Sequence, residues 1–173
     1  VLVTKEGMSI RFSETELRDQ GRNTVGVWGI RLDKNDELVA LAVVDTNATL
    51  LVAGSNGIGK RTHFEEYRKQ SRGGKGIITM KTGEKTGTVV GGLTVREEGE
   101  IMLITKNGKM VRTPVKNIRE SGRNTQGVRL VNIDDNDSLT AIAPVVTVEQ
   151  EEKAGEGEEE EAGTGNQSTK SVS

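Results

Sequence analysis

The sequence predicts an all-β protein built from three repeats of about 50 residues, each forming a blade of about four antiparallel strands. Three observations support this prediction. The chain repeats itself twice along its length. Its 22 glycines supply many tight turns. Val, Ile and Thr dominate the apolar runs, and none of these runs is long enough to sustain a helical stripe.

The first repeat predicts a series of short strands. Residues 1–11 form a hairpin with Gly7 in its turn, and residues 13–19 are polar and too short for an independent helix. A GRNT turn at 21–24 leads into apolar residues at 25, 27, 30 and 32, which we expect to form a strand with a bulge at Gly29. An acidic turn and an apolar strand at 38–44 close the unit.

The same series recurs at two offsets. Thr4, Lys5, Gly7 and Arg11 recur 101 residues later as Thr105, Lys106, Gly108 and Arg112, and GRNT recurs at 122–125. An offset of 50 places Gly57, Arg61, Arg68, Arg72 and Gly76 on Gly7, Arg11, Arg18, Arg22 and Gly26. We therefore divide the chain into blades at 1–47, 48–98 and 99–148. A blade cannot bury both of its faces alone, so each needs neighbours on both sides.

Composition excludes several classes of protein. Hydrophobic residues make up 32% and aromatic residues 2% of the chain, so the core must consist mainly of small aliphatic side chains. The absence of cysteine removes disulfides and thiolate catalysis and favours a cytosolic protein, and the single histidine, His63, argues against a histidine-based metal site. No apolar run reaches the roughly 20 residues of a membrane span, and no signal peptide is recognisable. Because Val1 stands inside a strand-like run, we expect the chain to be a fragment of a longer one.

Charge is divided unevenly along the chain. From Glu149 onward, eight acidic and two basic residues carry −6, and because the total is −2, residues 1–148 carry +4. Residues 149–173 are rich in Glu, Gly and Ser, which predicts a disordered acidic tail. The asymmetry favours a polyanionic partner for the basic body, and we hypothesise that the tail competes with that partner.

Arginines recur at three equivalent positions of the repeats. These positions hold Arg11, Arg61 and Arg112, then Arg18, Arg68 and Arg119, and then Arg22, Arg72 and Arg123. Arginine forks suit phosphate oxygens, so we expect many of these residues to line one curved edge. About a third should instead pair with carboxylates inside the blade, foremost those at the Arg18 position.

The Gly-rich segment at 70–77, QSRGGKGI, is the strongest cationic loop. Its glycines allow tight turning and close approach to a partner, and the second repeat adds further lysines at 60, 69, 81 and 85. The predicted phosphate-contacting residues are Gln70, Arg72, Gly73, Gly74, Lys75 and Gly76 in this loop, with Lys60, Arg61, Lys69, Arg11, Arg22, Arg112 and Arg123 outside it.

Other features argue for structure rather than chemistry. The few aromatic residues cannot form a stacking platform for single strands, so a nucleic-acid partner would be duplex DNA held by its backbone. Tyr67 is expected to be buried. Asp134 and Asp135 fall in a predicted turn. The GSNGIGKRT segment at 54–62 lacks the spacing of a phosphate-binding P-loop and is expected to be a hairpin. We find no nucleophile with a matching base.

Together, QSRGGKGI, the preceding EEYRKQ, the GRNT turns and the ITKNGKMVRTPV hairpin resemble the C-terminal domain of the DNA gyrase A subunit, from Val1 to about Val148. The resemblance implies a β-pinwheel, a propeller-like ring of six blades that exchange strands, whose basic perimeter wraps double-stranded DNA. It implies a non-catalytic part of an ATP-dependent type II topoisomerase that introduces negative supercoils in the bacterial cytoplasm, at the nucleoid. The parent subunit would form an A2B2 heterotetramer with the gyrase B subunit. ATP and Mg would act there, and no cofactor is expected in this chain.

The sequence differs from the family's defining motif at one position. Residues 70–76 match the heptapeptide Q-[RK]-R-G-G-[RK]-G except at Ser71. By its order in the chain this is a later, box-like loop, so the chain corresponds to the last three blades and the acidic tail. Two alternatives remain open: the equivalent C-terminal domain of topoisomerase IV, and a propeller-type scaffold that binds proteins.

Overall fold

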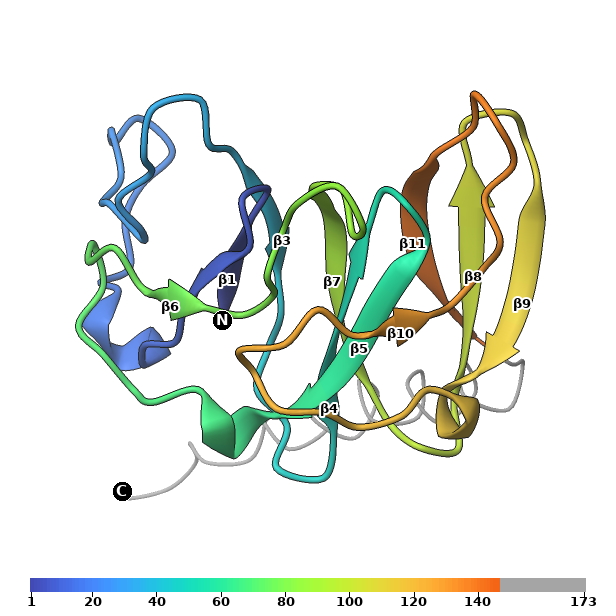
Figure 1. The fold of residues 1–173 in the computed structure, drawn as a ribbon. Coiled ribbons are helices and arrows are strands. Elements are labelled where there is room, and N and C mark those ends of the chain that lie inside the picture. The colour runs from blue at the N-terminus through green and yellow to red at the C-terminus, as the bar shows by residue number, and fades with distance from the viewer. Residues whose placement is uncertain (147–173) are drawn as a thin grey trace, which may run out of the picture.

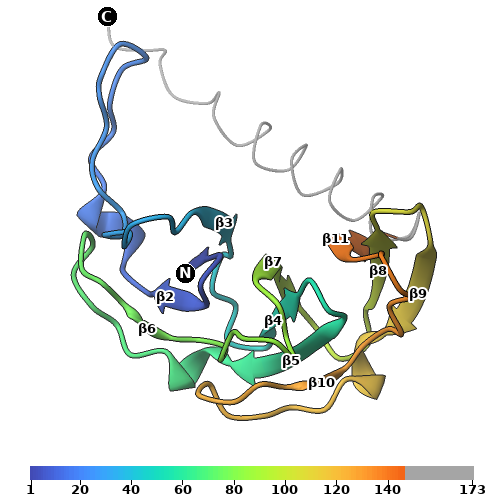
Figure 2. The same ribbon diagram turned by 45° about the horizontal axis from the view of Figure 1, so that its top comes forward.

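The structure is a computed structural model that describes residues 1–146, so the predicted acidic tail at 149–173 lies outside the described residues. Three antiparallel sheets stand side by side in an arc (Figures 1 and 2). This arrangement confirms the all-β prediction. The second strand of each hairpin is followed by a short 3-10 turn, at Glu14–Glu16, Phe64–Glu66 and Val115–Asn117.

The first two sheets each have four strands, one of which comes from the following repeat. The first sheet has the order β3-β1-β2-β6, and the second has the order β10-β5-β4-β7. Their strands are β1 (Leu2–Thr4), β2 (Met8–Ile10), β3 (Leu38–Leu41) and β6 (Ile77–Ile78), then β4 (Thr49–Gly54), β5 (Ile58–His63), β7 (Val89–Val95) and β10 (Val128–Arg129). The blades therefore exchange strands, because β6 pairs with β2 and β10 pairs with β5.

The third sheet has three strands. Its order is β11-β8-β9, with β8 at Glu100–Thr105, β9 at Met110–Pro114 and β11 at Leu139–Val145. The outer strand β9 has no fourth strand beside it among residues 1–146. The hairpins expected at 1–11 and 54–62 are confirmed by the pairing of β1 with β2 and of β4 with β5.

The strand expected at 25–32 does not form, and the exchange explains why. Its counterparts in the later repeats are β6 and β10, which gain their hydrogen bonds from the sheet of the preceding blade. No preceding blade exists for the first repeat among residues 1–146, so Trp28 is 70% exposed. Apolar alternation identified the segment, but the partner strand decides whether it becomes β structure.

A glycine stands where each exchanged strand begins. Gly76 has φ +78, and a Cβ there would lie 2.2 Å from the Ser9 carbonyl oxygen. Gly127 has φ +99, and its Cβ would lie 2.4 Å from the Gly59 carbonyl oxygen. Both positions need the left-handed conformation and the missing side chain. The last glycine of the Gly-rich segment thus lets the chain cross onto its neighbour's sheet.

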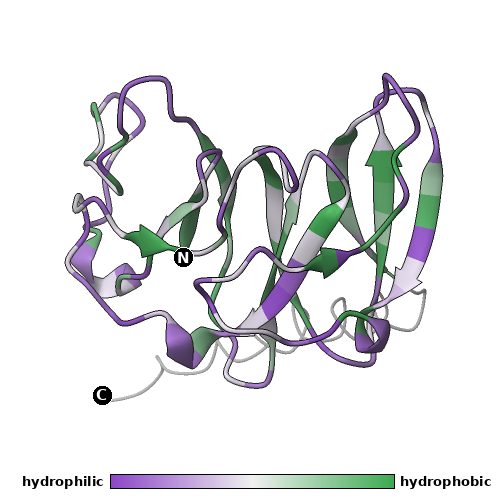
Figure 3. Ribbon diagram, in the orientation of Figure 1, coloured by the Kyte–Doolittle hydropathy of each residue, from purple (hydrophilic) through white to green (hydrophobic). Residues whose placement is uncertain are grey.

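The middle blade is buried on both faces, as the repeat predicts. Leu50 and Val52 of β4 point into one apolar cluster, while Leu51 and Ala53 point into the other, as expected for alternating strand positions. Each such large aliphatic side chain contributes about 1.5–3 kcal/mol when buried. Tyr67 is also buried, as expected, with its hydroxyl 2.7 Å from Thr79 Oγ1. Figure 3 shows the apolar residues concentrated on the strands.

Candidate nucleic-acid interface

The connecting segments that carry most of the predicted contact residues run along the convex side of the arc, where β6 and β10 lie (Figure 2). We call this side the convex perimeter and define it by residues 68–81 and 119–131. Polar residues dominate these segments, although the strands beneath them are apolar (Figure 3). The perimeter is therefore the surface on which the predicted cations can be compared for exposure and for partners.

The first arginine position joins neighbouring blades rather than facing solvent. Arg11 Nη1 donates to the carbonyl oxygens of Phe64, at 2.8 Å, and Tyr67, at 3.3 Å, in the next repeat. Arg61 repeats this contact one blade later, where its Nε donates to the Ile118 carbonyl at 2.6 Å. Phe64 begins its 3-10 turn, and Tyr67 and Ile118 stand at the C-terminal ends of theirs, so each arginine binds carbonyls of a turn in the following blade.

Arg61 is too deeply placed to contact a phosphate. It is 6% exposed, and its guanidinium also lies 3.0 Å from Glu120 and 3.5 Å from Glu97. The prediction that Arg61 contacts DNA is therefore corrected, because all its donors point into a joint between blades. Arg112, at the same position of the last blade, turns onto Glu100 of its own hairpin.

The Arg72 position forms a second contact between blades. The Arg72 backbone N–H donates to Glu16 Oε2 at 3.1 Å, and its guanidinium donates to the Trp28 carbonyl at 3.3 Å. Arg123 makes the equivalent pair, with its N–H 2.8 Å from Glu66 Oε2 and its guanidinium on the Ile78 carbonyl. Both side chains are half-buried, whereas Arg22 is exposed. The arginines at the Arg11 and Arg72 positions are thus used largely to hold the blades together.

Lys60 lies entirely inside the protein. It is 0% exposed, and its Nζ donates to the carbonyl oxygens of Gly122, at 2.7 Å, and Arg123, and to Thr125 Oγ1 at 3.1 Å. Desolvation lowers the pKa of Lys60 from 10.5 to about 8; the nearby Glu66 carboxylate opposes this shift, while Arg123 adds to it. The prediction that Lys60 contacts DNA is corrected. Its ammonium supports the 121–125 loop from beneath.

The Gly-rich loop is fixed mainly through its backbone. The Gln70 N–H donates to the Arg11 carbonyl at 2.8 Å, and the Gly73 N–H donates to the Gly29 carbonyl at 2.7 Å. Gly73 needs its glycine for φ +76, whereas a Cβ added at Gly74 would meet Ile10 and Ser71 only at ordinary contact distances. Lys75 is exposed, with Nζ 3.3 Å from the equally exposed Asp33, a pairing that water screens strongly. Lys69 is exposed as well.

The arginine position expected to be paired is the one that remains open. Arg18, Arg68 and Arg119 are exposed, and their side chains make no hydrogen bond or salt bridge within residues 1–146. Each lies two residues after a 3-10 turn, and its exposed side chain points to solvent instead of entering a joint. The prediction of which arginines are paired and which are exposed was therefore reversed. The sequence does not show which blade each segment faces.

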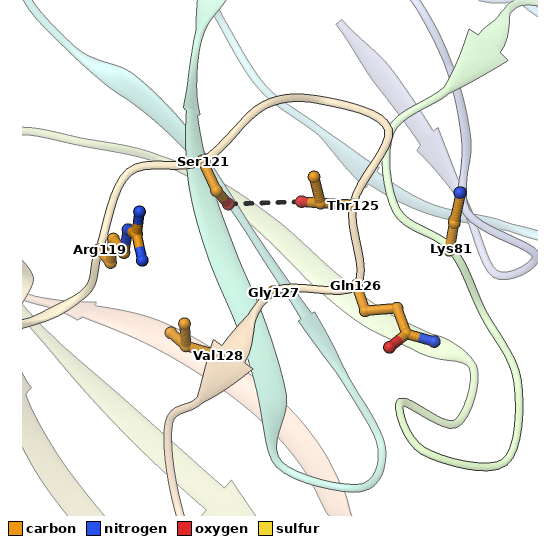
Figure 4. Close-up of a pocket in the computed structure, with 7 residues that line it drawn as sticks. All are labelled: Lys81, Arg119, Ser121, Thr125, Gln126, Gly127 and Val128. Carbon is orange, nitrogen blue, oxygen red and sulfur yellow. Dashed lines mark hydrogen bonds between the residues drawn. The ribbon is translucent and has the colours of Figure 1, made fainter.

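One hollow on the perimeter collects open cations and polar groups (Figure 4). Its volume is about 440 Å³, and it is lined by Lys81, Arg119, Ser121, Thr125, Gln126, Gly127 and Val128. No carboxylate is among the lining residues. Lys81 did not enter the predicted contact set, although its equivalence to Arg31 through the offset of 50 would have identified it.

Two classes of site find no support in the part of the chain that the structure describes. Residues 1–146 contain no group of three or more His, Cys, Asp or Glu side chains able to hold a metal ion. They also contain no helix long and apolar enough to cross a membrane. Asp134 and Asp135 lie in the expected turn, closed by a 3.0 Å hydrogen bond from the Asp137 N–H to the Asp134 carbonyl.

Comparison with known proteins gives a consistent result. Residues 1–45, 48–96 and 99–145 match the family described as the DNA gyrase C-terminal domain, beta-propeller. The DNA gyrase A subunit of Mycobacterium leprae is 46% identical over 83% of this chain, and that of Mycolicibacterium smegmatis is 47% identical over 83%. The chain spans only 11% and 17% of the lengths of these two relatives.

Solved structures show the same fold. A DNA gyrase A C-terminal domain superposes with a TM-score of 0.78 at 32% identity, covering 84% of this chain and 50% of the other. The C-terminal domain of DNA topoisomerase IV gives a TM-score of 0.79 at 23% identity, covering 92% of this chain and 50% of the other. The second likeness is evidence for the fold alone.

Proposed function

The chain belongs to the DNA gyrase C-terminal domain family, and from this membership we propose that it binds double-stranded DNA along the convex perimeter and bends it. The observation that carries the proposal is the placement of Arg68, Lys81 and Arg119. These cations are exposed on one curved side without protein partners among residues 1–146, while the buried cations hold that side in shape.

In this proposal the contacts go to the DNA backbone. Arginine and lysine neutralise phosphates without reading bases, and curvature selects DNA that bends easily. Smooth bending of a site of 20–30 base pairs costs about 1–6 kcal/mol, so several phosphate contacts must act together. The convex perimeter offers them in series, one cluster at each junction between blades.

The same family membership supports a proposal about the complex in which the chain acts. We infer that the chain acts as the non-catalytic wrapping part of a gyrase A subunit, which forms A2B2 with the gyrase B subunit in the bacterial cytoplasm. ATP and Mg serve the parent enzyme in this proposal. Negative supercoiling of DNA would then be the activity that the wrapped segment supports.

A salt titration of duplex binding tests the proposal. Fluorescence anisotropy with a labelled duplex of about 30 base pairs should give an affinity that falls steeply with salt, with a log–log slope of about −0.9 for each phosphate contacted. Two unrelated sequences of equal length should bind within about threefold of each other. A flat salt response would contradict DNA binding and favour the protein scaffold.

A charge reversal locates the surface. Lys75→Glu changes an exposed residue of the perimeter and should weaken duplex binding by about tenfold at low salt. Lys106→Glu, in the exposed turn between β8 and β9, makes the same charge change outside the perimeter and provides the control. If the control perturbs affinity as strongly as Lys75→Glu, in either direction, binding depends on net charge and not on the perimeter.

A further inference from the structure

The junction of the second and third blades holds an open cationic hollow, the one lined by Lys81, Arg119 and the 121–128 loop. The Lys81 N–H donates to the Thr125 carbonyl at 3.1 Å, which fixes the base of this side chain against the loop. Figure 4 shows Arg119 on one side of the loop and Lys81 on the other. Both are exposed, and neither side chain has a hydrogen-bond or salt-bridge partner among the described residues.

The loop between these cations is held rigidly. Thr125 Oγ1 donates to the Gly122 carbonyl at 2.8 Å and lies 3.4 Å from Ser121 Oγ. From the protein side, Lys60 Nζ donates to the carbonyls of Gly122 and Arg123. These bonds occupy the carbonyl oxygens of Gly122 and Arg123, and the Lys60 ammonium places a third positive charge beneath the loop. A fixed loop with its acceptors occupied and two open cations beside it favours an anion.

The same arrangement recurs at the junction of the first and second blades. The Arg31 N–H donates to the Gly74 carbonyl at 2.8 Å, which matches the bond between Lys81 and Thr125. The repeat then places Arg68 on Arg119 and Lys75 on Gln126. Arg31, Arg68 and Lys75 are all exposed, and Lys75 Nζ lies 3.3 Å from the exposed Asp33 carboxylate, so a bound phosphate would compete with this surface pair. Each junction therefore presents the same three positions, filled with three cations at the first and two at the second.

We propose that the hollow of Lys81, Arg119 and Gln126 holds one backbone phosphate of duplex DNA, and that Arg31, Arg68 and Lys75 hold another at the first junction. This inference rests on the proposed DNA binding and assigns it to residues between the blades. Lysine supplies a compact charge, arginine supplies a fork of donors, and the Gln126 amide adds a neutral donor. DNA following the perimeter is thus gripped once per junction.

A double substitution with a matched control tests the second junction. The combination of Lys81→Gln and Arg119→Gln should weaken duplex binding by about tenfold at low salt and make the salt slope shallower by about 1. The combination of Lys34→Gln and Lys106→Gln removes the same charge from exposed turns and should change affinity less than about twofold. Equal effects of the two double variants would overturn the assignment, whereas salt-independent binding by the unmodified chain would overturn the proposed function itself.

A gain of affinity provides a test that misfolding cannot imitate. Gln126→Lys installs at the second junction the residue type found at the first, and should tighten duplex binding by about threefold with a slope steeper by up to about 1. Unchanged or weaker binding by this variant would count against a phosphate at this position.

Inorganic phosphate distinguishes the source of the anion. At constant ionic strength, replacing chloride with about 10 mM phosphate should leave the thermal unfolding midpoint of the unmodified chain and of the Lys81 and Arg119 double variant equally unchanged. Phosphate could instead raise the midpoint of the unmodified chain alone, while the Lys81 and Arg119 double variant binds duplex as well as the control variant does. That result would make the hollow a site for free phosphate and overturn the assignment to DNA.

Discussion

Replacing Lys60 with methionine removes the buried ammonium beneath the 121–125 loop. Methionine should fit, because the equivalent positions hold the apolar residues Ile10 and Val111. The pKa of Lys60 is lowered from 10.5 to about 8, mainly because burial disfavours the charged form. One pKa unit corresponds to about 1.4 kcal/mol, so keeping this lysine charged costs the folded chain about 3 kcal/mol at neutral pH.

The sign of the pH dependence follows from proton binding. Below the folded pKa both states bind the proton, and the full cost of the buried charge is present. Between about 8 and 10.5 the unfolded chain binds more protons than the folded one, so the contribution of Lys60 to stability rises with pH. From about pH 7.5 to 9.5 this rise amounts to about 2 kcal/mol. Lys60→Met should lack this rise in the free energy of unfolding with pH. The hydrogen bonds that it loses change stability by the same amount at every pH and do not affect the comparison.

Urea unfolding followed by far-UV circular dichroism at about pH 7.5, 8.5 and 9.5 measures this difference. The free energy of unfolding of the unmodified chain, relative to Lys60→Met, should increase by about 2 kcal/mol over the range. Lys34→Met, at an exposed turn position, is the control and should show no such increase. A relative free energy that stays constant within about 0.5 kcal/mol would refute the claim that the Lys60 ammonium is desolvated.

Three further predictions concern the joints and the tail. Gly76→Ala brings a Cβ within 2.2 Å of the Ser9 carbonyl oxygen at φ +78, so it should lower the free energy of unfolding by about 2–4 kcal/mol, whereas Gly74→Ala, 3.6 Å from Ile10, should cost less than about 1 kcal/mol in the same urea titration. Arg61→Ala leaves the Ile118 carbonyl without its buried donor, while the partly exposed Glu120 keeps His63 as a partner, so it should lower the free energy of unfolding by about 1–3 kcal/mol. Arg112→Ala should leave the thermal midpoint nearly unchanged. Removing residues 149–173 should strengthen duplex binding at low salt and leave it unchanged at high salt, because it deletes a charge of −6; equal affinities at low salt would exclude competition by the tail.

Local patterns predicted the hairpins, the turns and the burial of Tyr67, because each depends on residues close in sequence or on a simple apolar alternation. They failed for residues 25–32, where the decisive hydrogen bonds come from another blade. The composition of this segment is that of a strand, and its counterparts β6 and β10 are strands. Exchange between blades is a property of the partner, which the sequence of one repeat does not contain.

The predicted exposure of the cations was wrong for a related reason. An exact recurrence such as Arg11, Arg61 and Arg112 predicts a shared partner outside the protein, and the lysine at position 60 predicts one more exposed cation. In the structure the Arg11 contact recurs at Arg61 because each joint presents the same carbonyls to an arginine. Exposure could not be predicted, since it depends on which side of the segment the next blade covers.

Positions that recur unchanged and positions that vary differ in what they contact. A joint needs the same donors at every junction, so the arginines at the Arg11 and Arg72 positions recur unchanged. A phosphate can pair with lysine or arginine over a range of geometries, so a position proposed to contact DNA can vary in residue type. The position of Arg31 and Lys81 varies in this way, and its third member is Asn132. Strict recurrence alone does not distinguish the two roles, because Arg18, Arg68 and Arg119 also recur unchanged and yet are exposed. The placement of each position relative to the next blade separates the cations that hold a joint from those that remain open.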